Sequence, residues 1–193
     1  RGVLFANNFA RIGLPHFCDP YWDRLYSAAQ DADIPINYHL GFSSFDVADA
    51  LEEQALAARR RAADSGFGRS HAVGVSAAFL NQATLVGEIV TSGICDRFPT
   101  LKFVSVECGF GHIPFYLETL DWHWRAYGNH TDLLPSDYFR RQCYGTFWFE
   151  ASTLPLLELF PDNFMFSTDY PHGTSLSPGP ASPAQLPRVH ISV

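Results

Sequence analysis

The chain has 193 residues, of which 47% are hydrophobic and 15% aromatic, so it can bury a sizeable core and is too apolar to be intrinsically disordered. Its formal net charge is −7 and its pI is about 5.5, which argues against a nucleic acid or an anionic membrane surface as partner, because both attract clustered cations. The four cysteines show neither a C-x-x-C spacing nor the density of a disulfide-rich domain, so we expect reduced thiols and a cytoplasmic protein.

The first part of the chain predicts two strands separated by a helix. An apolar run over residues 3–6 predicts the first strand, residues 19–32 have the spacing of a helix with Pro20 near its start, and residues 34–39 predict the second strand. Because the first strand starts so close to Arg1, which is not a methionine, we expect the natural N-terminus to lie upstream.

An alanine-rich helix is expected over residues 47–63, and the glycines of residues 64–68 break it, which suggests an insertion or lid. Polar residues interrupt the apolar stretch of residues 72–95, so no membrane span is predicted. The remaining elements, in order, are a helix over 75–91, a strand over 101–107, a helix with its apolar stripe at Ile113, Tyr116, Leu117, Leu120 and Trp124, a strand over 144–149, a short helix over 152–159 capped by Ser152, and a strand over 164–168.

Strand and helix thus alternate along most of the chain. This alternation is typical of parallel β/α units with right-handed crossovers, and we expect residues 1–193 to form a single α/β domain. The prolines that follow residue 173 exclude a continuous helix or central strand and predict a long loop over the site or a frayed end.

Three predicted strands end in a residue that can bind a metal or move a proton. His39 and Asp169 have nitrogen and oxygen donors suited to a divalent metal, although a structural histidine and a turn aspartate are the ordinary alternatives. Glu107 follows an apolar strand, where burial would require a cation, and that cation is either Lys102, Arg97 or Arg125, or a metal. The carboxyl ends of parallel strands meet on one face, so these three residues predict an active site.

Two further histidines, His112 and His172, lie just past predicted strand ends and are candidates to bind a substrate, with an ordinary surface loop as the alternative. The sequence has no G-x-S-x-G elbow, glycine-rich phosphate loop or H-E-x-x-H motif, which argues against serine hydrolases and nucleotide binding.

The chain resembles the amidohydrolase-related family that includes aminocarboxymuconate-semialdehyde decarboxylase and the hydroxybenzoate decarboxylases. The similarity spans nearly all of residues 2–190, in a fixed order of motifs. The segments that carry it are Pro35-Ile36-Asn37-Tyr38-His39, Asp96-Arg97-Phe98-Pro99-Thr100-Leu101-Lys102-Phe103 leading into Glu107-Cys108-Gly109-Phe110-Gly111-His112-Ile113-Pro114, and Ser167-Thr168-Asp169-Tyr170-Pro171-His172.

The resemblance implies a distorted (β/α)8 barrel with one divalent metal, often zinc. By this resemblance His39 is the metal ligand of the fifth strand, and Asp169 is the ligand of the eighth strand that also takes a proton from the metal-bound water. The resemblance also implies a pair of metal-binding histidines on the first strand, but no H-x-H precedes His39. We therefore expect an N-terminally truncated fragment that lacks roughly the first three strands and half of the metal ligands.

Glu107 occupies the position of a catalytic histidine in the decarboxylases, and a carboxylate cannot supply a cationic imidazolium to a substrate carboxylate. The sequence therefore predicts a metal-dependent hydrolase of a small carbonyl or carboxylate compound, with Asp169 and Glu107 as catalytic residues. The alternatives are a non-oxidative decarboxylase on the same scaffold and a non-catalytic barrel remnant. A small-molecule substrate is expected, and a homodimer is left open.

Overall fold

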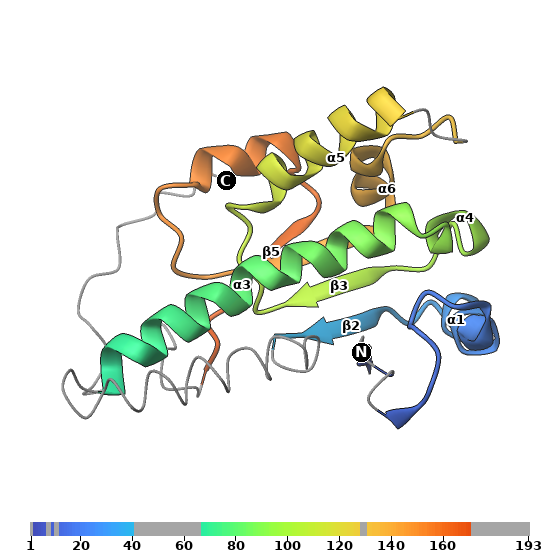
Figure 1. The fold of residues 1–193 in the computed structure, drawn as a ribbon, viewed down its shortest axis with the longest axis horizontal. Helices are drawn as coiled ribbons and strands as arrows, with labels where there is room; N and C mark the ends of the chain where they lie inside the picture. The colour runs from blue at the N-terminus through green and yellow to red at the C-terminus, as the bar shows by residue number, and fades with distance from the viewer. Residues whose placement is uncertain (1, 7–8, 10–11, 41–66, 128–130, 171–193) are drawn as a thin grey trace.

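A computed structural model describes residues 2–6, 9, 12–40, 67–127 and 131–170. Its centre is a five-stranded parallel sheet with the strands in sequence order (Figure 1). In the register of the sheet, Ile36 lies opposite Phe103 and Ser105 lies opposite Gly145. The strands are β1 Val3–Leu4, β2 Ile36–His39, β3 Phe103–Val106, β4 Cys143–Phe147 and β5 Phe164–Phe166.

Helical segments separate the strands, as the predicted alternation requires. Two of them, η2 and η3, are 3₁₀-helices rather than α-helices. In chain order the segments are η2 Pro20–Trp22, α1 Asp23–Asp31, α3 Phe67–Thr91, α4 Ile94–Arg97, α5 Ile113–Tyr127, α6 Pro135–Gln142 and η3 Leu154–Leu159.

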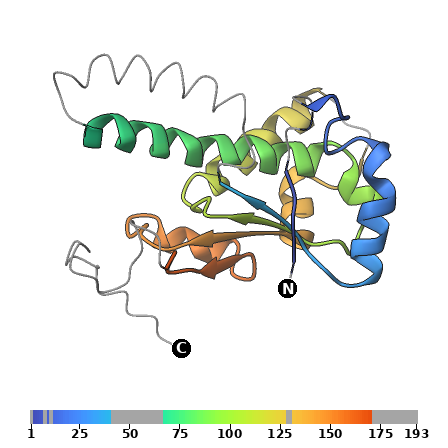
Figure 2. The same cartoon turned by 90° about the horizontal axis from the view of Figure 1, so that it is seen from below.

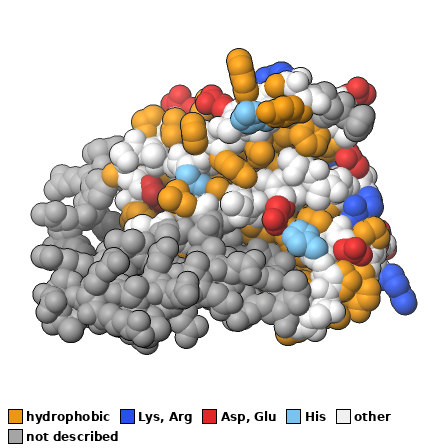
Figure 3. All heavy atoms as spheres, viewed as in Figure 1, with side chains coloured by type: hydrophobic (Ala, Val, Ile, Leu, Met, Phe, Trp, Pro, Cys, Tyr) orange, Lys and Arg blue, Asp and Glu red, His pale blue; other side chains and the backbone are white. Residues whose placement is uncertain are grey.

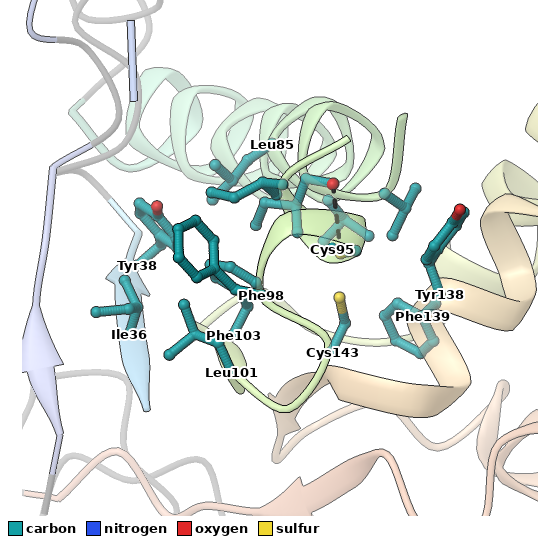
Figure 4. Packing of buried hydrophobic residues seen from close by; sticks show 14 of the residues in the cluster. Ile36, Tyr38, Leu85, Cys95, Phe98, Leu101, Phe103, Tyr138, Phe139 and Cys143 are labelled. Atoms are coloured by element: carbon teal, nitrogen blue, oxygen red, sulfur yellow. Dashed lines mark hydrogen bonds between the residues drawn. The ribbon is translucent and has the colours of Figure 1, made fainter. Parts of the chain in front are cut away.

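The core lies between the sheet and the helices that cover one of its faces. In β2 and β3 every second residue is buried, and Ile36, Tyr38 and Phe103 point toward α3, where Leu85 joins them (Figure 4). Figure 2 shows α3 running along this side of the sheet. Each such buried side chain contributes about 2 kcal/mol to stability, so the alternation fixes which face the helices cover.

The other face of the sheet carries the partly exposed residues of the same alternation, including Asn37, His39, Val104 and Val106. Since the helices lie on the opposite side, this is the face that a barrel would enclose. The helices that cover the sheet themselves expose apolar side chains to solvent. These side chains gather over α5 in Figure 3 and include Phe115 and Trp122.

Two predicted elements need correction, and two observed helices were not predicted. Helix α3 begins at Phe67, inside the predicted break, because a glycine within a long helix costs only about 1 kcal/mol. The predicted helix over residues 152–159 is the 3₁₀-helix η3, with Thr153 and not Ser152 at its N-cap. No element was predicted over residues 94–97, which form α4, or over residues 135–142, which form α6.

The other elements agree with prediction to within a few residues, and the stripe on α5 packs inward at Ile113 and Leu117. All four cysteines are free thiols. Among the described residues no helix has both the length and the hydropathy needed to cross a membrane. The expected helix over 47–63 and the proline-rich end from residue 173 lie outside the described residues.

Candidate active site

The three candidate residues at strand ends lie on the same edge of the sheet. His39 is the last residue of β2, Glu107 directly follows β3, and Asp169 follows β5 after two further residues. Because all the strands are parallel, their carboxyl ends open on this one edge. Residues up to 130 positions apart in sequence are thereby brought together.

His39 is held with one ring nitrogen directed at a backbone carbonyl and the other at Glu107. Nδ1 lies 2.6 Å from the Leu40 carbonyl oxygen, which can only accept, so Nδ1 carries the proton and donates. The other ring nitrogen, Nε2, lies 3.0 Å from Oε1 of Glu107, and in this hydrogen bond either the ring or the carboxyl group supplies the proton. A histidine whose second nitrogen is fixed in this way is oriented as metal ligands are.

Glu107 also forms a hydrogen bond with Asp169, so that the three side chains are linked. Burial raises the pKa of Glu107, the hydrogen bond with Asp169 raises this pKa further, and the nearby His39 lowers it. Two carboxylates in contact share a proton readily, since one of them must donate. The side chains of His39 and Glu107 remain 33% and 24% exposed, which leaves them accessible to a small molecule.

Two of the three predicted cationic partners of Glu107, Arg97 and Lys102, are engaged elsewhere. Arg97 Nε donates to Asp23 at 3.2 Å, and Lys102 Nζ donates to Asp33 at 2.7 Å. Glu107 therefore does not pair with Arg97 or Lys102. Its observed partners are His39 and Asp169.

Both acidic residues of the site have a backbone conformation that is rare for residues other than glycine. The φ angles of Glu107 and Asp169 are 56° and 57°, a left-handed conformation that costs a non-glycine residue about 1 to 2 kcal/mol. Such strain persists only where surrounding contacts fix it, and it concentrates at functional sites. Here the Glu107 backbone N–H donates to Thr146 Oγ1 at 2.8 Å.

The sequence pattern missed two residues next to the site, Thr146 and Glu150. The Glu150 carboxylate accepts hydrogen bonds from the backbone N–H groups of Phe110 and Trp148, at 2.9 and 3.0 Å. The signal that identified Glu107, a carboxylate directly after an apolar strand, was present for Glu150 as well, because residues 144–149 were predicted as a strand. Thr146 gave no signal, since a threonine within a strand is ordinary.

Of the two candidate substrate-binding histidines, His112 lies within the described residues and His172 does not. His112 immediately precedes α5, its Nε2 is buried without a hydrogen-bond partner in the described part of the chain, and burial lowers its pKa to about 4. It is thus a neutral imidazole, and the hydrogen bonds that link His39, Glu107 and Asp169 do not include it. His172 lies outside the described residues.

The donor types of the site fit a divalent metal, but the set is partial. An imidazole nitrogen and carboxylate oxygens are the ligands that zinc takes in catalytic sites. However, no three histidine, cysteine, aspartate or glutamate side chains within the described residues are arranged to hold a metal ion. The nearby Cys108 is no nucleophile, because burial raises the pKa of its thiol to about 11.

A parallel β/α sheet with a histidine and two carboxylates at its carboxyl edge defines an α/β protein of the barrel class with a candidate active site. A family model described as amidohydrolase matches residues 1–188, and the chain belongs to this family. The match confirms the resemblance noted in the sequence, and the fold is that of part of a (β/α)8 barrel.

Solved structures of the same class are similar to the chain. The 5-carboxyvanillate decarboxylase LigW from Sphingomonas paucimobilis is 25% identical, with a TM-score of 0.63 over 88% of this chain and 48% of that one. An amidohydrolase from Mycobacterium avium subsp. paratuberculosis is 19% identical, with a TM-score of 0.62 over 82% and 38% of the two chains.

A dihydroxybenzoic acid decarboxylase from Polaromonas sp. JS666, solved with bound manganese and 2-nitroresorcinol, is 24% identical, with a TM-score of 0.51 over 84% and 47% of the two chains. The chain therefore spans about half or less of the length of these structures. No curated protein matches it in sequence.

Proposed function

We propose that the full-length protein is a metal-dependent hydrolase that acts on a small carbonyl or carboxylate compound. The observation that supports this most directly is the linked set of His39, Glu107 and Asp169 at the carboxyl edge of the sheet. An imidazole next to two carboxyl groups offers nitrogen and oxygen donors for a cation and groups that accept and donate protons, and metal-assisted hydrolysis needs both.

In this proposal His39 Nε2 and the Asp169 carboxylate hold one divalent metal, zinc being the first candidate, together with ligands from outside the described residues. When bound, such an ion lowers the pKa of water to about 7 and polarises a carbonyl group. Asp169 accepts the proton that the attacking water loses. Glu107, whose pKa is raised, orients the carbonyl or passes a proton to the leaving group.

A decarboxylase is the second candidate, and the similarity to the two decarboxylases favours it. On the same site the metal would hold the oxygens of the substrate while a ring or enol carbon is protonated. The position of Glu107 argues for ranking this reaction second, because a carboxylate repels a substrate carboxylate and an imidazolium attracts it. Manganese is the alternative metal, given the ion in the Polaromonas structure.

The test uses purified full-length protein loaded with zinc or manganese. Proton release from a panel of small esters, lactones and amides measures hydrolysis, and carbon dioxide release from hydroxybenzoates, including 5-carboxyvanillate, measures decarboxylation. We expect Asp169→Asn to lower the active reaction at least 100-fold and the exposed Asp162→Asn to leave it unchanged. Full activity in Asp169→Asn would refute both enzymatic proposals.

The third reading, a non-catalytic remnant, predicts a different result in the same preparations. A full-length protein that binds no divalent metal, and in which His39→Ala changes neither metal content nor activity, would establish it. We further propose a cytoplasmic protein with no nucleic-acid or membrane partner, and gel filtration of the full-length protein decides whether it is a homodimer.

A further inference from the structure

We infer that β4 and the chain that directly follows it position Glu107 through two side chains, the hydroxyl of Thr146 in the strand and the carboxylate of Glu150 just after it. This inference rests on the proposed function, in which Glu107 is catalytic. The first contact is direct, because Thr146 Oγ1 accepts a hydrogen bond from the Glu107 backbone N–H at 2.8 Å. It fixes the residue at the point where the chain leaves β3.

The second contact fixes the other end of the same short segment, residues 107–110. Oε1 of Glu150 accepts from the Phe110 N–H at 2.9 Å, while Oε2 accepts from the Trp148 N–H at 3.0 Å. One carboxylate therefore ties the chain after β3 to the chain after β4. Hydrogen bonds to a charged acceptor are among the stronger ones in proteins, so this tie is stiff.

The backbone between the two contacts shows why a tie is needed. Glu107 and Gly109 have φ angles of 56° and 65°, so the segment makes two left-handed steps within three residues. A Cβ atom at Gly109 would collide with Oε1 of Glu150, which means that the carboxylate fills the space a side chain would take. A glutamate in left-handed backbone relaxes unless its neighbours hold it.

Both residues act on Glu107 through the backbone of residues 107–110, and they are therefore positioning residues. The contact between Glu107 Oε1 and His39 Nε2, which are 3.0 Å apart, reports whether Glu107 is correctly positioned. If either tie is lost, the Glu107 carboxylate is no longer held at His39, although the His39 side chain and its bond to Leu40 are untouched.

The experiment follows the ring nitrogens of His39 by NMR in full-length protein with ¹⁵N-labelled histidine, without added metal and at one fixed pH. Glu107→Ala gives the resonance of His39 Nε2 in the absence of the Glu107 carboxylate. We expect Glu150→Gln and Thr146→Val each to move the Nε2 resonance at least half of the way to that reference. The exposed Glu158→Gln removes the same charge on η3 and should leave the resonance in place.

A wild-type Nε2 resonance in both Glu150→Gln and Thr146→Val, together with a shifted one in Glu107→Ala, would overturn the inference and leave the proposed function standing. No shift in Glu107→Ala would also overturn it, because His39 would then not be bonded to Glu107. Should Glu150→Gln fail to fold, Thr146→Val decides alone. The proposed function is tested separately, and it fails if Asp169→Asn keeps full activity.

Discussion

Two buried glutamines show how much a side chain depends on what surrounds it. Gln82 on α3 and Gln142 on α6 are each 1% exposed. Gln142 Nε2 donates to the carbonyls of Phe98 and Leu101, at 2.9 and 2.8 Å, whereas neither polar atom of Gln82 has a partner in the described part of the chain. A buried amide without partners loses its hydrogen bonds to water and gains none.

This contrast predicts opposite effects for the same substitution. Gln82→Met should raise the free energy of unfolding by about 1 kcal/mol, because it removes an unsatisfied amide, and Gln142→Met should lower it by about 2 kcal/mol, because it leaves two carbonyls unpaired. Urea unfolding of both variants measures the difference. A destabilised Gln82→Met would mean that the amide has a partner, such as a buried water.

His112 predicts how stability depends on pH. Burial lowers the pKa of His112 to about 4, against an ordinary value of 6.5, so the unfolded chain binds the proton more readily than the folded one. The contribution of His112 to stability is complete above pH 6.5 and is lost as the pH falls toward 4, by up to about 3 kcal/mol.

Replacement of His112 by phenylalanine removes this titration while it keeps a ring in the buried site. The free energy of unfolding should therefore fall less between pH 6.5 and pH 4 in His112→Phe than in the wild type. Chemical unfolding at a series of pH values is the measurement. Parallel curves for the two proteins would show that His112 is not a buried neutral imidazole.

At the scale of the element, α6 forms because of contacts that are distant in sequence. Its eight residues are mostly polar, which is why no helix was predicted there. At its N-terminus the buried Asp121 of α5 accepts hydrogen bonds from Ser136 N and Oγ, at 3.0 and 2.7 Å. At its C-terminus Asn163 donates to the carbonyls of Phe139, Arg140 and Cys143.

Asp121→Ala should therefore destabilise the protein by about 2 kcal/mol, since it removes a charged acceptor from two donors of α6. The exposed Asp132→Ala, which deletes the same charge near the same helix, should change stability by less than about 0.5 kcal/mol. Thermal unfolding of the two variants distinguishes this tertiary cap from a general effect of charge. Equal melting temperatures would contradict it.

At the scale of the whole molecule, the sheet ends at two strands that have one neighbour each in the described residues. These are β1 and β5, and both expose apolar side chains, among them Leu4 and Met165. An unpaired strand with an apolar surface offers its free N–H and C=O groups to any other strand.

A polypeptide of residues 1–193 expressed by itself should therefore associate at concentrations of tens of micromolar. Replacing Leu4 and Met165 by lysine should reduce the association, because charged edge strands resist pairing. Leu80→Lys is the control, since Leu80 is equally apolar and exposed but lies on α3. Light scattering after gel filtration measures the mass, and a monomer at every concentration would contradict the prediction.

The sequence by itself determined the order of the strands, most of the helices between them, the parallel sheet and the three residues at its carboxyl edge. This was possible because apolar alternation and helical spacing are local patterns, and because parallel strands bring their ends together whatever lies between them. Only the tertiary structure decided that Glu107 contacts His39 and Asp169 rather than Arg97 or Lys102, that Glu150 and Thr146 hold the 107–110 segment, and that α6 is a helix. Each of these depends on a hydrogen bond between distant parts of the chain, and such a bond leaves no periodic trace in the sequence around either partner.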